Sequence, residues 1–510
     1  MKANKQTVLL ILDGYGIPQN IKVSAITKDN THFMQSLAKQ YGYTALEASE
    51  EFVGLPDKQV GTSDVGHLTI GSGRTIYQPL VRINKSIKDG TFAKNKVLLN
   101  AVREAKEKHS KIHILGLISD GGVHSHIQHL YELLKFMKMQ DFKNVCIHAF
   151  ADGRDTPIKS VKTYLKEIEE ECIKLKTGEV VSLIGRAYAL DRDKNWDRVK
   201  LSYDLLFKGL GTQVDDFYNA IDMQYEDGIT DEFLKPIHKG ETVIKENDVV
   251  IIFNYRADRE RQLSYALKHG DKLGYTNKEI NISVYTMTNY DNSQKDLNVL
   301  FDEIPLTNIL SEVLSNRGYR QFKTAETEKY AYVTFAMNAG RIEPFKNEDR
   351  EIVSSVKLES YASCPEMSAR KVSKVAINAI SSNKYDFVAI NIANPDMVGH
   401  SGNFDATKKA IQVVDEVVKE IVDTVLSCNA RIIIVADHGN ADTMKYADGT
   451  ACSSHSVAKV PFMIIEKGIK YELKESGTLA DVAPTILDLF NEKQPKEMTG
   501  RSLIVKVDKL

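Results

Sequence analysis

The sequence has few of the features that mark secreted or zinc-stabilised proteins. Only five of its 510 residues are cysteines. They are odd in number and no two form a C-x-x-C pair, so neither a disulfide framework nor a zinc ribbon is expected. This usage of cysteine is typical of a reducing compartment. The cysteines are Cys146, Cys172, Cys364, Cys428 and Cys452.

Long apolar runs and an excess of positive charge are also missing. The apolar run at residues 8–12 ends at Asp13 and is too short for a signal-peptide core or a membrane span. Lys and Arg total 67 against 69 Asp and Glu, a net charge of −2, whereas nucleic-acid-binding proteins concentrate positive charge. We therefore expect a cytoplasmic protein with neither a membrane nor a nucleic acid as its partner.

The length and the apolar pattern indicate more than one α/β domain. A chain of 510 residues is too long for a single hydrophobic core. Short apolar runs alternate with helical patterns, which is typical of mostly parallel, buried strands. Apolar residues at three- and four-residue spacing predict helices at residues 159–174 and 406–426. Strands are expected at residues 8–12, 112–118, 145–150, 180–184, 249–253, 282–285, 387–392 and 432–436.

The residue types that follow these strands divide the chain into two parts. Ligands of open α/β sheets lie outside the carboxyl ends of the strands, so these positions are informative. Asp and His follow the strands of the first and last thirds, and Arg, Asp and His follow those of the middle third. We predict a discontinuous domain, residues 1–75 and 305–510, with a second α/β domain inserted at residues 76–304.

The strand ends of the discontinuous domain offer metal ligands. Mixtures of carboxylate and imidazole suit Mn, Zn or Co better than Ca, which takes oxygen ligands only. Two adjacent cations would neutralise phosphoryl charge and lower the pKa of a bound hydroxyl. Asp13, Asp437 and His438 form one candidate ion site, and Asp396, His400 and His455 form the other.

Each of these segments also has a plainer structural interpretation. An Asp after a strand is often a helix N-cap, and Asp-His-Gly-Asn at residues 437–440 could be a turn. The histidine cluster of His124, His126 and His129 is denser and could itself bind metal. Its residues lie at the start of a helix and point in different directions, so we expect His126 and His129 to be solvated.

A serine and a series of arginines complete the chemistry. Ser63 lies between glycines, where it could be an N-cap, but a serine oxygen bound to a cation becomes a competent nucleophile. Surface arginines are usually solvated ion-pair partners, yet five of them follow consecutive buried strands here. Arginine forks bind carboxylate and phosphate oxygens, so the series predicts a small polyanionic ligand. The arginines are Arg154, Arg186, Arg192, Arg256 and Arg259, and His124 could add a contact.

Eight motifs, in order along the chain, indicate a resemblance to a known family. The sequence resembles the cofactor-independent phosphoglycerate mutases of the alkaline-phosphatase superfamily along essentially its whole length. The motifs are LDGYG at residues 12–16, SDVGH at 63–67, SDGGVHSH at 119–126, DGRDT at 152–156, NYRADR at 254–259, AETEKY at 325–330, NPDMVGH at 394–400 and DHGNAD at 437–442.

The resemblance implies an activity and a mechanism. Members interconvert 3-phosphoglycerate and 2-phosphoglycerate in glycolysis and gluconeogenesis without 2,3-bisphosphoglycerate, as monomers with two Mn-type ions. Ser63 would be the phosphorylated nucleophile, and Asp155 a candidate for proton transfer. The implied metal ligands are Asp13, Ser63, Asp437 and His438 for one ion and Asp396, His400 and His455 for the other. The implied substrate ligands are His124, Arg154, Asp155, Arg186, Arg192, Arg256, Arg259 and Lys329.

Some residues depart from the family pattern, and other functions remain open. Thr62 and Asp64 replace the usual Asn and Glu around Ser63, and residues 332–338 and 353–364 are atypical. For Lys329, a surface ion pair is the alternative interpretation. A metal-dependent phosphatase or a phosphopentomutase would share the metal motifs but lack the arginine series. A binding or sensor protein would need neither the serine nor the ligand set.

Overall fold

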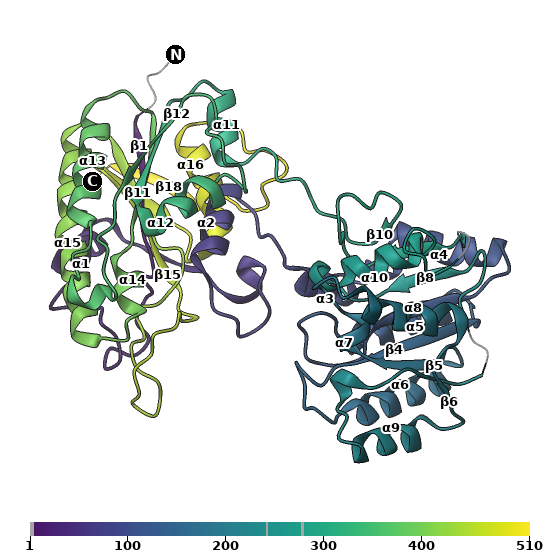
Figure 1. The fold of residues 1–510 in the computed structure, drawn as a ribbon. Helices are drawn as coiled ribbons and strands as arrows, with labels where there is room; N and C mark the ends of the chain where they lie inside the picture. The colour runs from purple at the N-terminus through teal and green to yellow at the C-terminus, as the bar shows by residue number, and fades with distance from the viewer. Residues whose placement is uncertain (1–4, 241–242, 277–279, 510) are drawn as a thin grey trace. The chain divides into compact units, whose positions relative to one another are not determined.

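The computed structural model describes residues 5–240, 243–276 and 280–509, and the chain divides into two compact units. Unit 1 comprises Met1–Gln78 and Pro305–Leu510, and unit 2 comprises Pro79–Ile304. The chain therefore crosses between the units twice, after Gln78 and before Pro305, where the sequence predicts crossings after residues 75 and 304. Figure 1 shows each unit as a sheet covered by helices.

The described residues of unit 1 form a ten-stranded sheet. Its strands are β1 (Thr7–Leu12), β2 (Thr44–Glu47), β11 (Gln321–Glu326), β12 (Glu348–Val353), β13 (Phe387–Ile392), β14 (Arg431–Val435), β15 (Val460–Glu466), β16 (Ile469–Leu473), β17 (Ser476–Thr478) and β18 (Ile504–Lys509). The main path runs β12-β11-β13-β1-β14-β15-β16-β18, and its first five strands are parallel. Every residue of β1, β13 and β14 is buried, as expected for parallel strands covered on both faces.

Helices cover both faces of this sheet. They are α1 (His32–Tyr41), α2 (Ser63–Ser72), α11 (Leu310–Asn316), α12 (Thr327–Ala331), α13 (Ala369–Ser381), α14 (Asn394–Gly399), α15 (Phe404–Ser427) and α16 (Val482–Leu489). In Figure 1, α1, α13 and α15 lie on one side of the sheet and α2, α11 and α16 on the other. The apolar residues of α15 recur at helical spacing and are buried, so this helix packs one face on the core.

Unit 2 has its own sheet of eight strands among the described residues. They are β3 (Ile112–Leu117), β4 (Val145–Ala151), β5 (Glu179–Gly185), β6 (Thr212–Gln213), β7 (Ile237–His238), β8 (Val249–Ile252), β9 (Ser283–Thr286) and β10 (Asn298–Val299). The order is β10-β9-β8-β3-β4-β5-β7-β6, and its first six strands are parallel. The central strands of both units are therefore parallel.

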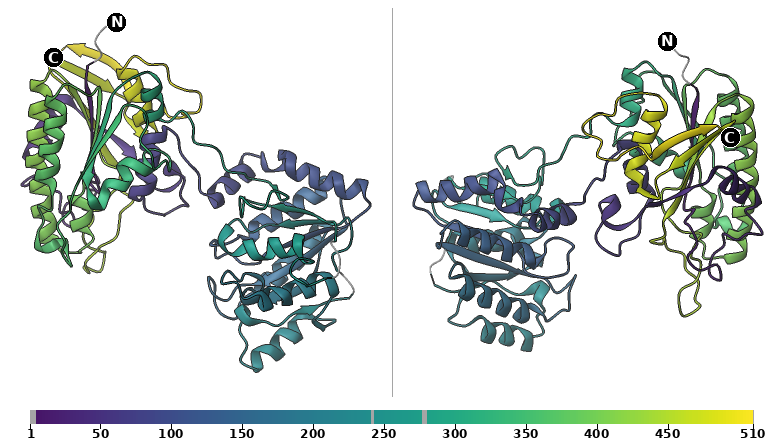
Figure 2. Two further views of the ribbon diagram at one scale, coloured as in Figure 1. Left: turned by 45° about the horizontal axis from the view of Figure 1, so that its top comes forward. Right: turned by 180° about the vertical axis from the view of Figure 1, so that it is seen from behind.

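Two hydrophobic cores lie on the two faces of the unit 2 sheet. The helices are α3 (Pro79–Lys88), α4 (Lys96–Glu107), α5 (Ile127–Met139), α6 (Val161–Leu175), α7 (Arg186–Ala189), α8 (Trp196–Lys208), α9 (Phe217–Glu226) and α10 (Ala257–His269). Along β8, Val249 and Ile251 belong to one core, and Val250 and Ile252 to the other. This alternation follows the two-residue period of a strand, and Figure 2 shows helices on both faces.

All eight strands expected from the sequence are confirmed, with ends that differ by at most one residue. The expected helices are confirmed as α6 and α15. The predictions left out the other ten described strands. Of these, β11 and β12 carry polar residues, whereas β15 is apolar and fully buried and could have been recognised. Within the described part of the chain, no helix has both the length and the apolar character needed to cross a membrane.

A buried chain of hydrogen bonds crosses the unit 2 sheet. His113 Nε2 lies 3.2 Å from Asp248 Oδ2, and His113 Nδ1 lies 2.8 Å from His148 Nε2. His148 Nδ1 in turn lies 2.7 Å from Ser182 Oγ. Because the Asp248 carboxylate only accepts, His113 Nε2 donates to it, and the chain is satisfied when His148 Nε2 donates to His113 and the Ser182 hydroxyl donates to His148. Burial and the neighbouring His113 hold the pKa of His148 well below its ordinary value.

We expect this chain to make unit 2 acid-sensitive. His148 is neutral when folded and takes up a proton when unfolded, so stability is lost as the pH falls below about 6.5, by about 1.4 kcal/mol per pH unit. Hydrogen exchange of the β4 amides between pH 7 and pH 5 measures this loss. The slope should flatten in His148→Leu and stay unchanged in the control His109→Gln, at an exposed position. An unchanged slope in His148→Leu would contradict the assignment.

Candidate active site

Carboxylates from distant parts of the sequence meet at one edge of the unit 1 sheet. The neighbouring strands β13, β1 and β14 are parallel, so their carboxyl ends lie together. Asp13 directly follows β1, Asp396 lies in α14 just after β13, and Asp437 follows β14. All three side chains are buried, with at most 1% of each residue exposed.

Ser63 lies at the centre of this edge. Its Oγ is 3.2 Å from Asp13 Oδ1 and 2.9 Å from His438 Nε2, and it accepts a hydrogen bond of 2.7 Å from Lys329 Nζ. Ser63 is the first residue of α2, and the N-cap is the preceding Thr62, whose hydroxyl accepts from the Val65 amide. The capping role considered for Ser63 is therefore filled by its neighbour, which leaves the Ser63 hydroxyl free for the site.

The helix that carries Ser63 packs very close to the strand-end loop. A Cβ atom added at Gly66 would lie 2.5 Å from the Asp437 carbonyl oxygen, a distance that real Cβ atoms do not show. Glycine at this position lets α2 approach the loop and brings Ser63 to the carboxylates.

Lys329 supplies a buried positive charge at the same point. Its Nζ lies 2.7 Å from Asp13 Oδ1 and 2.6 Å from Asp396 Oδ2, and only 3% of the residue is exposed. Burial opposes ionisation of Asp396, but Lys329 outweighs it and holds the pKa of this carboxyl well below its ordinary value. Burial likewise opposes the charge of Lys329, and Asp13 and Asp396 raise its pKa. The surface ion pair considered for Lys329 is thus wrong, because α12 turns it inward.

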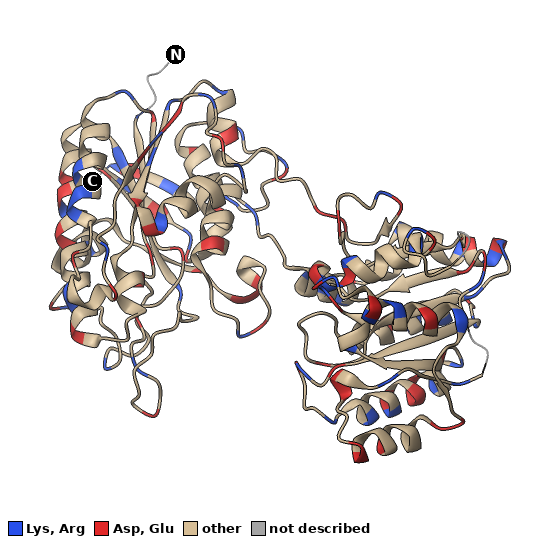
Figure 3. Cartoon of the chain, viewed as in Figure 1, with Lys and Arg blue, Asp and Glu red and all other residues tan. Residues whose placement is uncertain are grey.

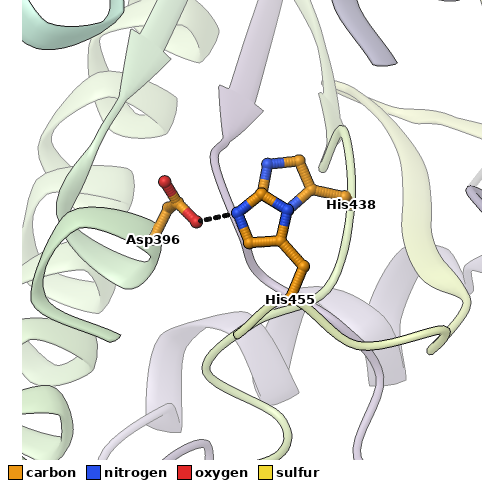
Figure 4. A group of neighbouring side chains, drawn as sticks. All are labelled: Asp396, His438 and His455. Atoms are coloured by element: carbon orange, nitrogen blue, oxygen red, sulfur yellow. Dashed lines mark ion pairs between the residues drawn. The ribbon is translucent and has the colours of Figure 1, made fainter. Parts of the chain in front are cut away.

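The second group of expected ligands surrounds Asp396. Asp396 Oδ1 lies 3.0 Å from His455 Nε2 and 3.3 Å from His400 Nε2. The rings of His438 and His455 stack at 3.9 Å, and Figure 4 shows them beside the Asp396 carboxylate. His438 therefore lies between the two expected groups, because its Nε2 is also 3.6 Å from Asp13 Oδ1.

The donor atoms at this edge suit metal ions. Two sets of three have donor atoms within 4.8 Å of one another, Asp396 with His438 and His455, and Asp13 with His67 and Asp437. Asp437 Oδ2 is buried and accepts no hydrogen bond from the described residues. An unsatisfied carboxylate oxygen amid mixed Asp and His donors is the arrangement expected of a transition-metal site.

A second cluster of expected residues lies at the carboxyl ends of the unit 2 strands. Arg186, after β5, donates from Nη1 to Asp152 Oδ1 and Asp155 Oδ2, both at 2.6 Å. His124 Nε2 lies 3.9 Å from Asp155 Oδ2. Burial and the guanidinium groups of Arg186 and Arg256 lower the pKa of His124 to about 4, so this imidazole is neutral near pH 7.

Three of the other arginines of this cluster are half-exposed and held by acidic side chains, and the fourth, Arg259, is held by a backbone carbonyl. Asp258 bridges Arg192 Nη1 and Arg256 Nε, each at 2.9 Å, and Arg154 Nη1 lies 3.3 Å from Glu232 Oε1. Arg259 Nη1 donates to the Leu190 carbonyl at 3.0 Å. The side chains of Arg154, Arg192 and Arg256 are 44–55% exposed, so their charge remains accessible to an anion.

The expected residues thus fall into two sets, one in each unit. Unit 1 holds Asp13, Ser63, Lys329, Asp396, His400, Asp437, His438 and His455, and unit 2 holds His124, Arg154, Asp155, Arg186, Arg192, Arg256 and Arg259. Lys329, expected among the substrate ligands, lies with the metal-ligand set. Acidic and basic residues are otherwise interspersed over both units (Figure 3), in keeping with the near-zero net charge.

The sequence reading missed several polar residues. His67, Asn391 and Asn440 are fully buried beside the strand-end carboxylates. His67 follows Ser63 by four residues on a helix, a spacing that places both on one face and could have revealed it. Asn391 and Asn440 carry no comparable signal, because asparagine at a strand end is also an ordinary turn residue.

The expectation for the histidine cluster was partly wrong. His129 is fully buried, with Nε2 2.8 Å from Asn84 Oδ1 and its ring against Tyr255. It faces inward because it lies on the apolar face of α5. His126 is half-buried and caps α5 by accepting from the Gln128 amide. Neither belongs to a potential metal-binding group among the described residues.

Comparisons with known families follow the division into two units. A family described as the BPG-independent PGAM N-terminus matches residues 83–292. A second, described as type I phosphodiesterase / nucleotide pyrophosphatase, matches residues 288–496. The first match lies wholly within unit 2, and the second begins in the last residues of unit 2 and covers most of the C-terminal part of unit 1.

Full-length relatives decide the assignment. The 2,3-bisphosphoglycerate-independent phosphoglycerate mutases of Clostridium tetani and Bacteroides fragilis are each 45% identical to this chain, with 98% of it and 99–100% of theirs aligned. The chain belongs to this family. A solved structure of Leishmania mexicana phosphoglycerate mutase at low cobalt concentration is 26% identical, covers 100% of this chain and 99% of that one, and has a TM-score of 0.54. The predicted alkaline-phosphatase-like α/β fold with an inserted α/β domain is confirmed.

One buried acid in this mutase-family chain is expected to titrate near neutral pH. Glu260 is fully buried at the start of α10 and accepts from Asn254 Nδ2, and its Oε2 has no hydrogen-bond partner among the described residues. Burial raises the pKa of Glu260 to about 8. Its carboxyl group is therefore largely protonated at pH 7, behind the arginines of unit 2.

We predict that Glu260→Gln changes the pH dependence of stability. The raised pKa means that wild-type stability is full below about 4.5 and is lost as the pH rises toward about 8, by about 1.4 kcal/mol per pH unit. The variant lacks this loss, so its thermal midpoint should gain on the wild type between pH 5 and pH 8. Parallel curves would refute the assignment, and the exposed Glu107→Gln serves as the control.

Proposed function

We propose that this chain interconverts 3-phosphoglycerate and 2-phosphoglycerate, independently of 2,3-bisphosphoglycerate, through a phosphoserine intermediate on Ser63. Such an enzyme is an isomerase that acts by intramolecular phosphoryl transfer in glycolysis and gluconeogenesis. The observation that carries the proposal is the position of the Ser63 hydroxyl, which lies within 3.2 Å of Asp13, His438 and Lys329. The family of full-length relatives supports the same reaction.

We further propose that two divalent ions serve the reaction, Mn²⁺ by preference, with Zn²⁺ or Co²⁺ as alternatives. The mixed Asp and His donors and the unsatisfied Asp437 Oδ2 support this proposal, as does the relative solved at low cobalt concentration. When bound, such ions neutralise phosphoryl charge and lower the pKa of a ligating hydroxyl. The residues that would hold them are Asp13, Ser63, Asp437 and His438 for one ion and Asp396, His400 and His455 for the other.

The protein's own groups account for the steps of the transfer. Ser63 Oγ gives up its proton and forms a bond to phosphorus while the bond from phosphorus to one ester oxygen of phosphoglycerate breaks, and that oxygen takes up a proton to become a glycerate hydroxyl. Lys329 contacts Ser63 Oγ and is placed to stabilise charge that develops on the phosphoryl oxygens. The other glycerate hydroxyl then loses its proton and forms a bond to phosphorus while the Ser63 Oγ–P bond breaks, and Ser63 Oγ takes up a proton again. Asp155, bound to Arg186, is a candidate to accept the proton of the attacking hydroxyl.

The arginine cluster is proposed to hold the substrate between the two transfers. Its half-exposed guanidinium groups match the carboxylate and phosphate oxygens of phosphoglycerate in bidentate geometry. The proposed ligands are His124, Arg154, Asp155, Arg186, Arg192, Arg256, Arg259 and Lys329. Exclusion of water during the transfer would favour isomerisation over hydrolysis of the phosphoserine.

The proposed setting is a cytoplasmic monomer whose partner is this small substrate, without a nucleic acid or a membrane. All five cysteines are free thiols, which supports a reducing compartment. The balanced charge of −2 supports the absence of a nucleic-acid partner.

Isomerisation by the purified protein tests the proposal. With 3-phosphoglycerate and Mn²⁺ but no 2,3-bisphosphoglycerate, we expect 2-phosphoglycerate to form. Activity should be lost on chelation of the metal and restored by Mn²⁺. Ser63→Ala removes the nucleophile, so we expect a loss of at least about 10³-fold in kcat, since the covalent route is closed.

The products identify which part of the proposal fails, if one does. Release of inorganic phosphate without isomerisation would support a metal-dependent phosphatase. No turnover with any divalent ion, together with tight binding of phosphoglycerate, would support a binding protein. Full activity in Ser63→Ala would exclude phosphoserine as the intermediate. Arg192→Ala, which removes one proposed substrate contact, is a matched variant that should raise KM and retain measurable turnover.

A further inference from the structure

Two fully buried polar residues, His67 and Asn391, lie among the carboxylates of unit 1 without a role in the proposed chemistry. Each has 0% of its surface exposed. His67 lies on α2, one helical turn after Ser63, and Asn391 lies on β13. Buried polar groups are normally retained only where they are hydrogen-bonded, so their partners indicate what they do.

The hydrogen bonds of Asn391 fix its orientation. Asn391 Nδ2 lies 2.7 Å from Asp13 Oδ2 and 3.1 Å from His67 Nε2. A carboxylate only accepts, so the amide nitrogen must face Asp13 and donate one hydrogen to it. The second hydrogen of the same NH2 group points to His67 Nε2. This nitrogen must therefore accept, which places the His67 proton on Nδ1.

The proton on His67 Nδ1 reaches the other side of the site. Nδ1 lies 2.8 Å from the Ser63 carbonyl oxygen and 3.2 Å from Asp437 Oδ2. A hydrogen-bonded chain centred on Asn391 therefore runs to Asp13 on one side and through His67 to the Ser63 carbonyl oxygen on the other, where His67 Nδ1 also contacts Asp437 Oδ2. The chain joins the loop after β14, helix α2, strand β13 and the residue after β1, which are four separate segments of the fold.

We propose that His67 and Asn391 are positioning residues that hold Asp13, Ser63 and Asp437 in one geometry and thereby set the affinity of the cation bound there. The inference rests on the two-cation site of the proposed function. Their effect should be confined to one ion, because Asp396 takes its contacts from His400, His455, Lys329 and Asn440 instead.

The expected magnitude follows from the behaviour of residues that orient metal ligands. Loss of such a partner typically weakens metal binding by about 10- to 100-fold, because the ligand must then be ordered by the ion itself. His67→Leu and Asn391→Leu keep approximate volume and remove the hydrogen bonds. Each variant should lower the affinity for one of the two ions by that factor and leave the affinity for the other unchanged.

Metal binding itself is the measurement. Protein stripped by a chelator is titrated with Mn²⁺ by calorimetry, and the bound ions are counted after equilibrium dialysis. His148→Leu is the matched control, since it removes an equally buried histidine from unit 2 and should bind both ions like the wild type. Far-ultraviolet circular dichroism establishes that each variant is folded before titration.

His67→Asn separates positioning from direct ligation. An asparagine amide can replace the Nδ1–H donor toward Ser63 and Asp437, so positioning predicts tighter binding in His67→Asn than in His67→Leu. It also predicts that Asn391→Leu weakens the same ion. If His67 ligates the ion directly, Asn391→Leu should have little effect and His67→Asn should bind as weakly as His67→Leu, and the proposal would be overturned.

Failure of this inference is distinguishable from failure of the proposed function. Fewer than two ions on the wild type would refute the two-cation site itself. Two ions on the wild type, with unchanged affinities in both leucine variants, would refute only the positioning role. An equal loss of affinity for both ions would also refute the positioning role, because the hydrogen-bonded chain through His67 and Asn391 contacts one set of ligands only. If His67→Leu does not fold, Asn391→Leu and His67→Asn still decide between the outcomes.

Discussion

The site in unit 1 is dominated by the repulsion among three buried carboxylates. Asp13, Asp396 and Asp437 lie at the ends of adjacent strands, and two unit charges 4 Å apart repel by roughly 4 kcal/mol at an effective dielectric constant of 20. Positive charge must therefore be present for all three to ionise. Lys329 contacts two of them but leaves Asp437 Oδ2 unsatisfied among the described residues. The clustered carboxylates therefore favour the binding of cations, and bound cations neutralise the charge of a phosphoryl group during its transfer.

The parallel sheet is what makes this concentration of charge possible. Each of β13, β1 and β14 is buried along its whole length and mostly apolar, and the packing of these strands fixes the carboxyl groups that follow them. The strands come from opposite ends of the chain, so unit 2 can be inserted between them without disturbing their pairing. The polar bridge of His67 and Asn391 then links loops that the sheet alone brings only to the same edge.

The apolar strands could be predicted from sequence because buried parallel strands leave continuous apolar runs, as at β1 and β4. The polar edge strand β12 has no such apolar run, and its charged residues are typical of a loop. The Asp and His residues at the strand ends could be proposed as one set, because the carboxyl ends of neighbouring parallel strands lie at the same edge of a sheet. The burial of Lys329 and His129 could not, because it depends on how α12 and α5 pack, and the charged sequence around Lys329 is typical of a surface.

The arginines of unit 2 differ from the carboxylates of unit 1, because each arginine is already held by a protein partner before any ligand binds. Asp258 holds Arg192 and Arg256 together, and Asp152 and Asp155 hold Arg186. Five guanidinium groups face four carboxylates, counting Glu232, so a positive excess remains for an anion. Because the forks are already placed, binding loses little side-chain entropy, which is the usual cost of recruiting long side chains. On the function proposed above, these arginines would retain glycerate through its charged carboxylate, and its uncharged hydroxyl groups would be free to exchange places.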